Sequence, residues 1–271
     1  MTEPTLTIVI VSYNARADLA RCLESLHTPA PQVPHEIVVV DNASSDESAA
    51  AARRWPDVTV IDAGANLGFA RANNLAIRAT SAPLVLLLNS DTVVPAGAVD
   101  HLVSILDAHP DVAVAAPRLV DGRGQPELSF GRMIGPFNEL RQKLLTLGHA
   151  RGVPLVRAFV DRATRVEHRP DWVSGACLLV RRVDAEAVGL LDERYFMYTE
   201  DVDFCAAVRA RGRSVLFTPA VEIVHLRGRS AASAPTATNR AYRQSQLAFY
   251  EKHHPRWVPL LRAYLRARGQ I

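Results

Sequence analysis

A run of five large aliphatic residues at positions 84–88 constrains the fold of this chain more than any other stretch. Because polar residues do not alternate within it, the run predicts a strand buried on both faces, as in a parallel sheet covered by helices. It ends in a polar cluster at residues 89–92. Ligands of open α/β sheets bind just beyond the carboxyl ends of the strands, so Asp91 is a candidate to hold a hard cation and a phosphate. The alternative is that the cluster only caps the next helix.

Expected strands and helices alternate along the first half of the chain. Apolar runs predict strands at residues 6–11, 36–40, 58–62 and 84–88, and helical spacing predicts helices at 18–26, 46–54 and 70–79. This order predicts one mostly parallel sheet with helices on both sides, an α/β fold. A polar cluster follows each strand, at residues 12–14, 41–46, 66–69 and 89–91. Because the carboxyl ends of parallel strands share one edge of a sheet, we expect these clusters to converge on one site.

The second half of the chain is less regular. Its apolar runs predict strands at residues 112–116, 177–180, 214–218 and 221–225, and helices at 98–109, 184–190 and in a segment ending at 211. Residues 129–169 hold two helical pieces, and long excursions of this kind are often lids or binding segments. A loop is expected at 228–238, followed by a helical tail at 239–268 that breaks near Pro255 and Pro259.

Composition excludes several classes of protein. With 271 residues, nearly half of them apolar, the chain can bury the core of one large α/β domain. The formal net charge of +3 is too small to indicate nucleic-acid binding. No stretch reaches the ~18 apolar residues of a membrane-spanning helix, and the N-terminus lacks the pattern of a signal peptide. Three scattered cysteines, Cys22, Cys177 and Cys205, show no zinc or disulfide spacing, which favours a reduced, cytoplasmic setting.

The sequence lacks the glycine-rich motifs that usually bind nucleotides through the backbone. Neither G-x-G-x-x-G nor G-x-x-x-x-G-K follows the first expected strand, which argues against a dinucleotide oxidoreductase and a P-loop NTPase. The G-x-S-x-G motif of a nucleophile elbow is also missing. A nucleotide would therefore have to be held by side chains and a metal ion.

A second acidic cluster lies at residues 199–203. Glu200, Asp201 and Asp203 place three carboxylates in four positions, where they repel one another. Such clusters persist when a cation, arginines or a proton-transfer task stabilises them. The alternative is that they favour the positive end of a helix that begins here. We prefer the helix-start explanation for Asp203 and a functional one for Asp201.

His225 ends the last expected strand and precedes two arginines, Arg227 and Arg229. A single histidine is more often structural or simply exposed. Asp91, however, needs a second ligand if it is to hold a divalent ion, and imidazole suits a borderline metal such as Mn²⁺. We therefore favour metal binding for His225.

Seven blocks of this sequence, in this order, resemble glycosyltransferase family 2, and within it the bacterial rhamnosyltransferase-like branch. They lie at residues 7–14, 40–46, 66–74, 88–92, 172–177, 196–204 and 225–230. The resemblance covers roughly residues 5–250 and implies a GT-A fold, a single Rossmann-like, mostly parallel sheet. It implies a glycosyltransferase domain over 1–230, with a nucleotide-sugar half at about 1–117 and an acceptor half at about 118–230. A C-terminal helical extension would follow at 231–271.

The resemblance also implies roles for individual residues. Asp91 and His225 would hold the metal, and Asp201 would be the general base with Glu200 beside it. Tyr13 and Asn14 would flank the base of the nucleotide, and Asp41 would hydrogen-bond to its edge. Further contacts to the nucleotide sugar would come from Ser12, Asn66, Gly68, Phe69, Asn73, Asn89, Ser90, Asp91 and Arg227. The acceptor would face Trp172, Ser174 and Gly175.

These assignments predict an inverting, metal-dependent glycosyltransferase that uses Mg²⁺ or Mn²⁺. The expected donor is dTDP-rhamnose, and the expected acceptor is a hydroxyl of a cell-envelope glycan or of a polyprenyl-diphosphate-linked sugar. One alternative keeps the reaction but uses UDP-GlcNAc, UDP-galactose or UDP-galactofuranose. Another is a nucleotide-sugar-binding paralogue without activity, which loss of Asp91 or Asp201 would indicate. Both residues are present.

The C-terminal tail mixes aromatic and basic residues, with four arginines between positions 256 and 268. Such a broken amphipathic helix suits the surface of an anionic bilayer. Packing on the main domain and a homodimer interface are the alternatives. We expect a cytoplasmic protein, either free or peripheral at the inner face of the plasma membrane, and no nucleic-acid partner.

Overall fold

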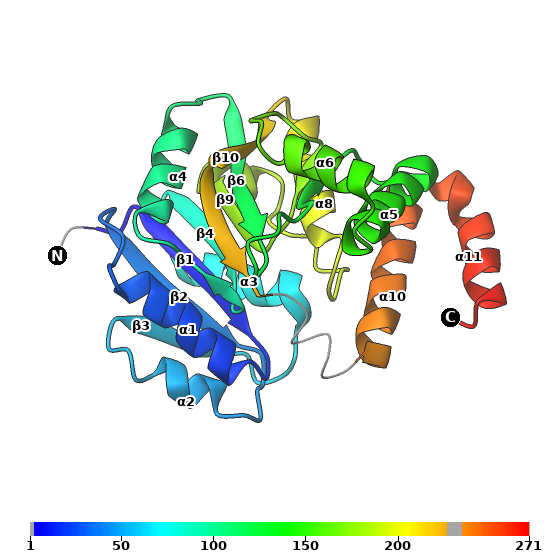
Figure 1. Cartoon of the computed structure of the whole chain (residues 1–271). Helices are drawn as coiled ribbons and strands as arrows, with labels where there is room; N and C mark the ends of the chain where they lie inside the picture. The colour runs from blue at the N-terminus through cyan, green and yellow to red at the C-terminus, as the bar shows by residue number, and fades with distance from the viewer. Residues whose placement is uncertain (1–2, 227–234, 271) are drawn as a thin grey trace.

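The computed structural model describes residues 3–226 and 235–270 of the chain (Figure 1). Arg227, a predicted donor ligand, lies outside the described residues. An eight-stranded sheet has the order β3-β2-β1-β4-β9-β6-β10-β5. Its strands are β1 (Leu6–Ser12), β2 (His35–Asp41), β3 (Val58–Asp62), β4 (Leu84–Asn89), β5 (Thr92–Val93), β6 (Val112–Val120), β9 (Cys177–Arg181) and β10 (Ser214–His225). A two-stranded sheet pairs β7 (Phe130–Gly131) with β8 (Trp172–Val173).

Helices connect and flank the strands. They are α1 (Arg16–His27), α2 (Ser48–Ala52), α3 (Gly68–Ala79), α4 (Ala98–Asp107), α5 (Pro136–Ala150), α6 (Pro154–Ala163), α7 (Arg182–Ala187), α8 (Glu200–Ala210), α10 (Pro235–His253) and α11 (Val258–Ala267), with a 3₁₀ turn η1 (Pro255–Trp257) before the last. The first four long strands are parallel, as predicted, and β6 is parallel to β10. Strand β9 runs antiparallel between β4 and β6. The predicted mostly parallel α/β sheet with flanking helices is confirmed.

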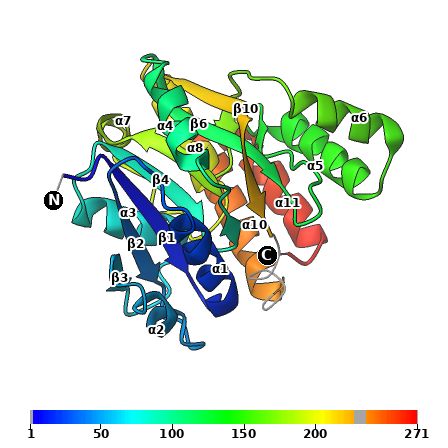
Figure 2. The same ribbon diagram turned by 60° about the vertical axis from the view of Figure 1, so that its left-hand side comes forward.

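Two hydrophobic cores lie on opposite faces of this sheet. Alternate residues of β4 point to each of them: Leu86 packs with α1, α2 and α4, whereas Leu87 packs with α3, α7 and α8. Strand β4 is buried on both faces, as its unbroken aliphatic run predicts. Figure 2 shows α1 and α2 beside β1 and β2. Because β4 is buried on both faces, the position of its end is well defined, and so are the positions of the polar residues that follow it.

Several boundaries differ from the sequence prediction. Strand β6 continues through Pro117 to Val120, because β9 pairs with it only at Val114 and Ala115 and leaves one side open, where proline is tolerated. The two short strands expected at 214–225 form one strand, β10, with an irregular register between Thr218 and Glu222. Helix α2 has only five residues. Helix α10 begins inside the expected loop at 228–238, of which residues 228–234 are not described.

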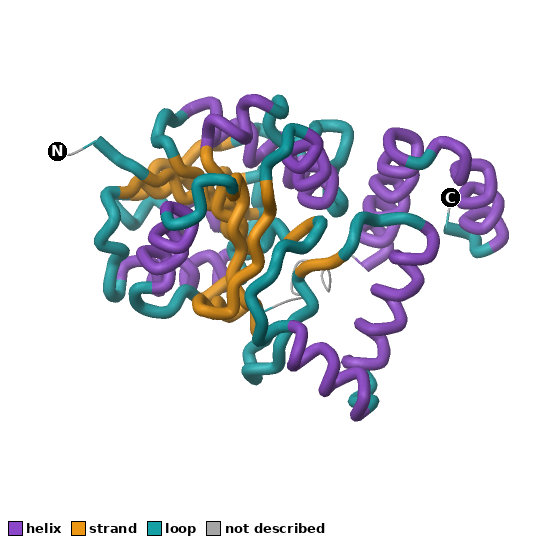
Figure 3. Tube along the Cα trace, turned by 90° about the horizontal axis from the view of Figure 1, so that it is seen from above, coloured by secondary structure: helices purple, strands orange, loops and turns teal. Residues whose placement is uncertain are grey.

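The last helices stand beside the sheet rather than on either of its faces (Figures 1 and 3). Helix α10 packs on the main domain: Phe249 is fully buried and, with Tyr250, forms a third apolar cluster with Tyr195 and Val202. For α10, packing on the domain is therefore the observed arrangement among the alternatives for the tail. Within residues 3–226 and 235–270, no helix is both long and apolar enough to cross a membrane.

Candidate active site

The carboxyl ends of the parallel strands place the predicted polar residues along one edge of the sheet. Ser12 at the end of β1 is paired in register with Asp41 at the end of β2. On the other side of β1, Val11 is paired with Asn89 at the end of β4. Because these ends are adjacent strand neighbours, the first, second and fourth polar clusters meet as expected.

Two oxygen atoms at this edge are buried and have no hydrogen-bond partner within the described part of the chain. They are Oγ of Ser12 and Oδ1 of Asp41. The other carboxylate oxygen of Asp41 accepts the N–H of Ser44 at 3.0 Å, which orients the side chain. A buried acceptor without a partner costs free energy, so these atoms are suited to the N–H and O–H groups of a ligand.

Asn42 organises the loop that leads into α3, and the sequence prediction did not assign it to the site. Its Nδ2 donates to Asn66 Oδ1 at 3.0 Å, and its Oδ1 accepts the N–H of Leu67 at 2.8 Å. Asn66 Oδ1 also accepts the N–H of Gly68 at 3.1 Å. The amide oxygen of Asn66 is thus engaged in hydrogen bonds within the loop. Asn14 is similar, because its Oδ1 accepts the N–H of Ser45 at 2.8 Å, while the neighbouring Tyr13 is exposed.

Gly68 allows the segment before α8 to touch the start of α3. Its φ of +80° is left-handed, and a Cβ there would lie 2.2 Å from the carbonyl oxygen of Phe196. The N–H of Phe69 donates to the same oxygen at 2.7 Å. Asn73, one turn on, donates from Nδ2 to Phe69 O at 2.8 Å, and its buried Oδ1 has no partner in the described chain. The close contact with Phe196 therefore explains why a glycine stands at position 68. Asn73, in contrast, has an amide oxygen that could accept a hydrogen bond from a ligand.

Asp91 and His225 are brought together although 134 positions separate them in the sequence. The antiparallel pair β5–β10 sets Thr92 opposite His225, and His225 Nε2 lies 3.2 Å from Asp91 Oδ1. Nδ2 of Asn89 is 3.4 Å from the same nitrogen, and Ser90 is buried between Asn89 and Asp91. The predicted pair therefore exists as a contact in the structure.

Glu127 completes this group from the segment between β6 and β7. Its Oε2 lies 3.2 Å from Nδ1 of His225, on the opposite side of the ring from Asp91. Burial lowers the pKa of His225, but hydrogen bonds to Asp91 and then Glu127 outweigh burial and raise the pKa to about 9. A carboxylate that holds the far nitrogen of a histidine is the usual support of a metal-binding imidazole.

The donor set of this group fits a borderline divalent cation such as Mn²⁺. A carboxylate oxygen and an imidazole nitrogen lie 3.2 Å apart, and the second ring nitrogen is held by Glu127. No group of three or more His, Cys, Asp or Glu side chains suited to a metal ion occurs in the parts of the chain that the structure describes. The remaining ligands would therefore be oxygen atoms of a bound substrate and of water.

Asp201 lies at the same edge, next to the end of β4. Its Oδ2 accepts the N–H of Gly175 at 2.9 Å, and its Oδ1 accepts the N–H of Val202 at 2.8 Å. The N–H of Asn89 donates at 2.9 Å to the carbonyl oxygen of Ala176, the residue after Gly175. The backbone segment Gly175–Ala176 thus contacts both Asp201 and the end of β4, two residues before Asp91.

Burial perturbs both carboxylates at the start of α8. Desolvation raises the pKa of Asp201, although the N–H groups of Gly175 and Val202 oppose the shift. Desolvation and the charge of Asp201 raise the pKa of Glu200 well above its ordinary value. Oε2 of Glu200 is buried without a hydrogen-bond partner in the described chain. A carboxylate with a raised pKa is a better proton acceptor, as general base catalysis requires.

The family of the chain follows from its similarity to known proteins. The family model described as Glycosyl transferase family 2 matches residues 7–162, more than half of the chain. An N-acetylglucosaminyl-diphospho-decaprenol L-rhamnosyltransferase of Mycobacterium tuberculosis is 30% identical over 281 residues, covering 95% of this chain and 87% of the relative. The chain belongs to glycosyl transferase family 2.

Further similarities agree with this family 2 glycosyltransferase and its fold. Rhamnosyltransferase WbbL of Escherichia coli is 25% identical over 228 residues, covering 80% of this chain and 82% of the relative. Mannosyltransferase PcManGT of Pyrobaculum calidifontis, solved with GDP-Man and Mn²⁺, superposes with a TM-score of 0.62 at 19% identity, covering 97% of this chain and 70% of that chain. The GT-A-like fold, the enzyme class and the rhamnosyltransferase-like branch are confirmed.

The predicted acceptor residues of the glycosyltransferase divide into two groups. Gly175 lies beside Asp201, because a Cβ at Gly175 would be 3.3 Å from the ring of Phe69 and 3.4 Å from Cβ of Asp201. Ser174, next to it, is held by a 2.8 Å hydrogen bond from its N–H to Ser129 O. The indole N–H of Trp172, by contrast, already donates to Arg132 O at 2.8 Å, so only its ring is available to a ligand.

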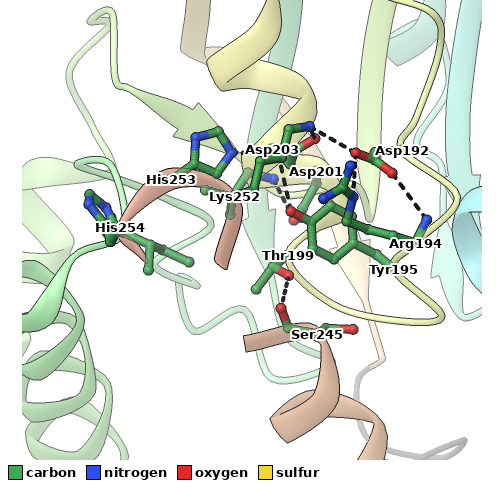
Figure 4. Close-up of polar contacts among 12 residues, drawn as sticks. Asp192, Arg194, Tyr195, Thr199, Asp201, Asp203, Ser245, Lys252, His253 and His254 are labelled. Carbon is green, nitrogen blue, oxygen red and sulfur yellow. Dashed lines mark hydrogen bonds and ion pairs between the residues drawn. The ribbon is translucent and has the colours of Figure 1, made fainter. Parts of the chain in front are cut away.

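Asp203 is buried in the first turn of α8, where helix α10 clamps it (Figure 4). Lys252 Nζ lies 2.8 Å from its Oδ2, and His253 Nε2 lies 2.5 Å from its Oδ1. The hydroxyl of Tyr195 also donates to Oδ1, at 3.2 Å. The helix-start prediction for Asp203 is confirmed by position. The contacts with Lys252 and His253 also tie α8 to α10, a role that the sequence around Asp203 does not predict.

The same helix supports the backbone that leads to Asp201. Tyr198 and Thr199 both have left-handed φ angles, +72° and +66°, which cost free energy in residues other than glycine. Ser245 of α10 donates from Oγ to Met197 O at 2.7 Å, and Thr199 Oγ1 donates to Ser245 O at 3.4 Å (Figure 4). Helix α10 therefore holds the turn from which the base candidate projects.

We expect Asp203→Asn to lower the free energy of unfolding by about 1–3 kcal/mol, because Lys252 and His253 would lose a buried carboxylate partner. Urea unfolding measures the change. Arg262→Ala is the matched control, since its ion pair with Glu251 is half exposed and should cost about 0.5 kcal/mol or less. Equal losses in the two variants would contradict the clamp.

Proposed function

We propose that this glycosyltransferase moves rhamnose from dTDP-rhamnose, with inversion, onto a hydroxyl of a polyprenyl-diphosphate-linked sugar or another cell-envelope glycan. One observation carries the proposal. Gly175 contacts Asp201, a carboxylate with a raised pKa, and the next residue, Ala176, contacts Asn89, two residues before Asp91 of the metal-type Asp91–His225 pair. The names of two relatives, a decaprenol-linked rhamnosyltransferase and a rhamnosyltransferase, support the sugar and the acceptor class.

The residues at this edge of the sheet have different roles in the proposed reaction. The unpartnered buried oxygens of Ser12 and Asp41 are suited to accept hydrogen bonds from the nucleotide. Asp91 and His225 would hold a divalent ion, with Glu127 fixing the imidazole ring. When bound, that ion supplies positive charge against the departing diphosphate. We assign residues 1–117 to the nucleotide sugar and residues 118–230 to the acceptor.

Asp201 would take the proton from the acceptor hydroxyl as that hydroxyl attacks the anomeric carbon. The N–H groups of Gly175 and Val202 hold the carboxylate in one orientation. Burial raises its pKa, which strengthens it as a base. A direct displacement needs only one such base, because no covalent intermediate has to be formed and hydrolysed. Inversion at the anomeric carbon follows.

The proposed location is the cytoplasm, either free or at the inner face of the membrane, where a polyprenyl-linked acceptor would be met. The three cysteines are free and buried in the structure, which agrees with a reducing compartment. Contact of the C-terminal residues with lipid belongs to the same proposal, and a homodimer is the alternative.

A thermal-shift panel of dTDP-, UDP- and GDP-sugars, with and without Mg²⁺ or Mn²⁺, tests the donor. A ligand that binds only the folded state at about 100 times its Kd adds about 2.7 kcal/mol of stability. We expect the largest shift from dTDP-rhamnose with metal. A larger shift from a UDP-sugar would replace the proposed donor. No shift from any sugar nucleotide would contradict the function itself.

Glu127→Gln should reduce metal-dependent donor affinity about 10- to 100-fold, since the carboxylate that supports the His225 ring would become a neutral amide. Titration of Mn²⁺ at fixed donor concentration measures the loss. Glu167→Gln is a control remote from the site. An unchanged Mn²⁺ requirement in Glu127→Gln would remove Glu127 from this supporting role.

A further inference from the structure

Helix α5 exposes a stripe of large apolar side chains. Phe137, Leu140, Leu144 and Leu147 follow helical spacing on one face and are 46–78% exposed, and no residue of α5 is buried. A fifteen-residue helix without a buried side chain gains little stabilisation from packing against the rest of the protein. Contiguous exposed apolar surface on a water-facing protein commonly marks an interaction site.

Helix α11 continues this surface. Trp257, Leu260 and Tyr264 are exposed on one side of the helix, while Leu265 is buried on the other. The rings of Phe137 and Trp257 meet edge to face at 6.4 Å between centroids, which joins the two stripes. We call these seven side chains the apolar platform: Phe137, Leu140, Leu144, Leu147, Trp257, Leu260 and Tyr264.

The charge around the apolar platform is basic. Residues 255–270 contain four arginines and no acidic residue. On α5, Arg141 is exposed, and its guanidinium lies 5.9 Å from the centroid of the Phe159 ring of α6. The one acidic residue of α5, Glu139, instead accepts a hydrogen bond from Tyr250 of α10 at 2.9 Å. A second copy of this surface would meet like charges, whereas anionic phospholipid would meet opposite ones.

We propose that the apolar platform seats the enzyme on an anionic lipid bilayer. Apolar and aromatic side chains would enter the interface and the surrounding arginines would meet lipid phosphates. Helix α10 ties this surface to the reaction, because it contacts Glu139 of α5 through Tyr250 and Asp203 of α8 through Lys252. The purpose of the seating, access to a polyprenyl-linked acceptor, rests on the proposed function, but the binding is measured without either substrate.

The experiment is co-sedimentation of the full chain with phosphatidylcholine vesicles with or without phosphatidylglycerol. We expect partition into the phosphatidylglycerol vesicles only. Leu144→Asp should weaken it about tenfold or more, and Arg266→Glu about fivefold or more with a reduced salt dependence. Val183→Asp is the matched control, because its side chain is 70% exposed and α7 lies on the opposite side of the molecule from α5 and α11 (Figure 2); this variant should bind as the wild-type protein does.

Three outcomes would overturn the proposal. The protein remains in the supernatant with both vesicle types, or it partitions equally into both, or light scattering shows a dimer that Leu144→Asp dissociates. The donor-induced thermal shift is recorded for each variant. If the protein shows the donor-induced thermal shift but does not bind vesicles, only the lipid-binding role of the apolar platform is rejected. If it binds vesicles but shows no donor-induced thermal shift, only the proposed function is rejected.

Discussion

Replacing Asp201 with asparagine is expected to lower the rate of sugar transfer by about 10³-fold or more while leaving the affinity for the donor unchanged. The amide keeps the size of the side chain but cannot accept the proton of the attacking hydroxyl, and a positioned base contributes about 10²–10⁴-fold. Donor affinity should persist because Asp201 contacts Gly175 and Val202, in the part of the site that we assign to the acceptor. Single-turnover transfer and donor-induced thermal shift measure the two effects separately.

The control for this variant is Asp107→Asn, an exposed carboxylate on α4. The pH profile gives a second readout. Burial raises the pKa of Asp201, and the base works only when it has lost its proton, so the rate of the unchanged enzyme should rise with pH through an apparent pKa above the ordinary range for aspartate. Asp201→Asn should lose that dependence. Normal turnover in Asp201→Asn would exclude it as the base.

Replacing Asp91 with alanine is expected to remove the effect of Mn²⁺ or Mg²⁺ on donor binding and to lower transfer by at least about 100-fold. Asp91 is the carboxylate 3.2 Å from Nε2 of His225, and without it the metal ion that would stabilise the departing diphosphate would lose a ligand. The measurement compares donor-induced thermal shifts with and without metal. Without metal, the variant and the unchanged protein should give similar shifts.

Asp62→Ala is a matched control for Asp91→Ala. Asp62 is an exposed carboxylate at the end of β3, on the same edge of the sheet, and pairs with Arg53 on the surface. Its loss should leave the metal effect intact. A metal effect that survives in Asp91→Ala would place the divalent ion elsewhere, or show that transfer does without one.

Local sequence predicted the parts of this site that end strands. The aliphatic run of β4 fixed its burial on both faces, so the position of Asp91 at the sheet edge followed from pattern alone. His225 was predicted as the partner of Asp91 because it ends a strand and an aspartate that holds a metal needs a second ligand, and the two side chains are in contact. Where that strand would lie was not predictable, since β10 is four strands from β1 in the sheet and its end is brought to Asp91 by pairing with β5.

Contacts between segments that are far apart in the sequence were not predicted. Glu127 lies in the segment between β6 and β7, and no sequence spacing connects it with His225, 98 residues later. Lys252 and His253 sit in a tail that reads as an amphipathic helix, and nothing in that pattern points to Asp203. Pro117 suggested the end of a strand, yet β6 continues, because a proline is costly only where its missing N–H would have been paired.

The dependence of α8 on α10 has a consequence for protein engineering. A shortened chain that stops after β10 would expose the apolar surface formed by Tyr195 and Val202 and remove the contacts that hold the left-handed turn at Tyr198 and Thr199. Exchanging the tail between relatives to alter acceptor choice should therefore fail unless the donated helix also brings equivalents of Phe249 and Lys252. The sequence of the tail suggests a peripheral extension, but its helix α10 holds α8 in position.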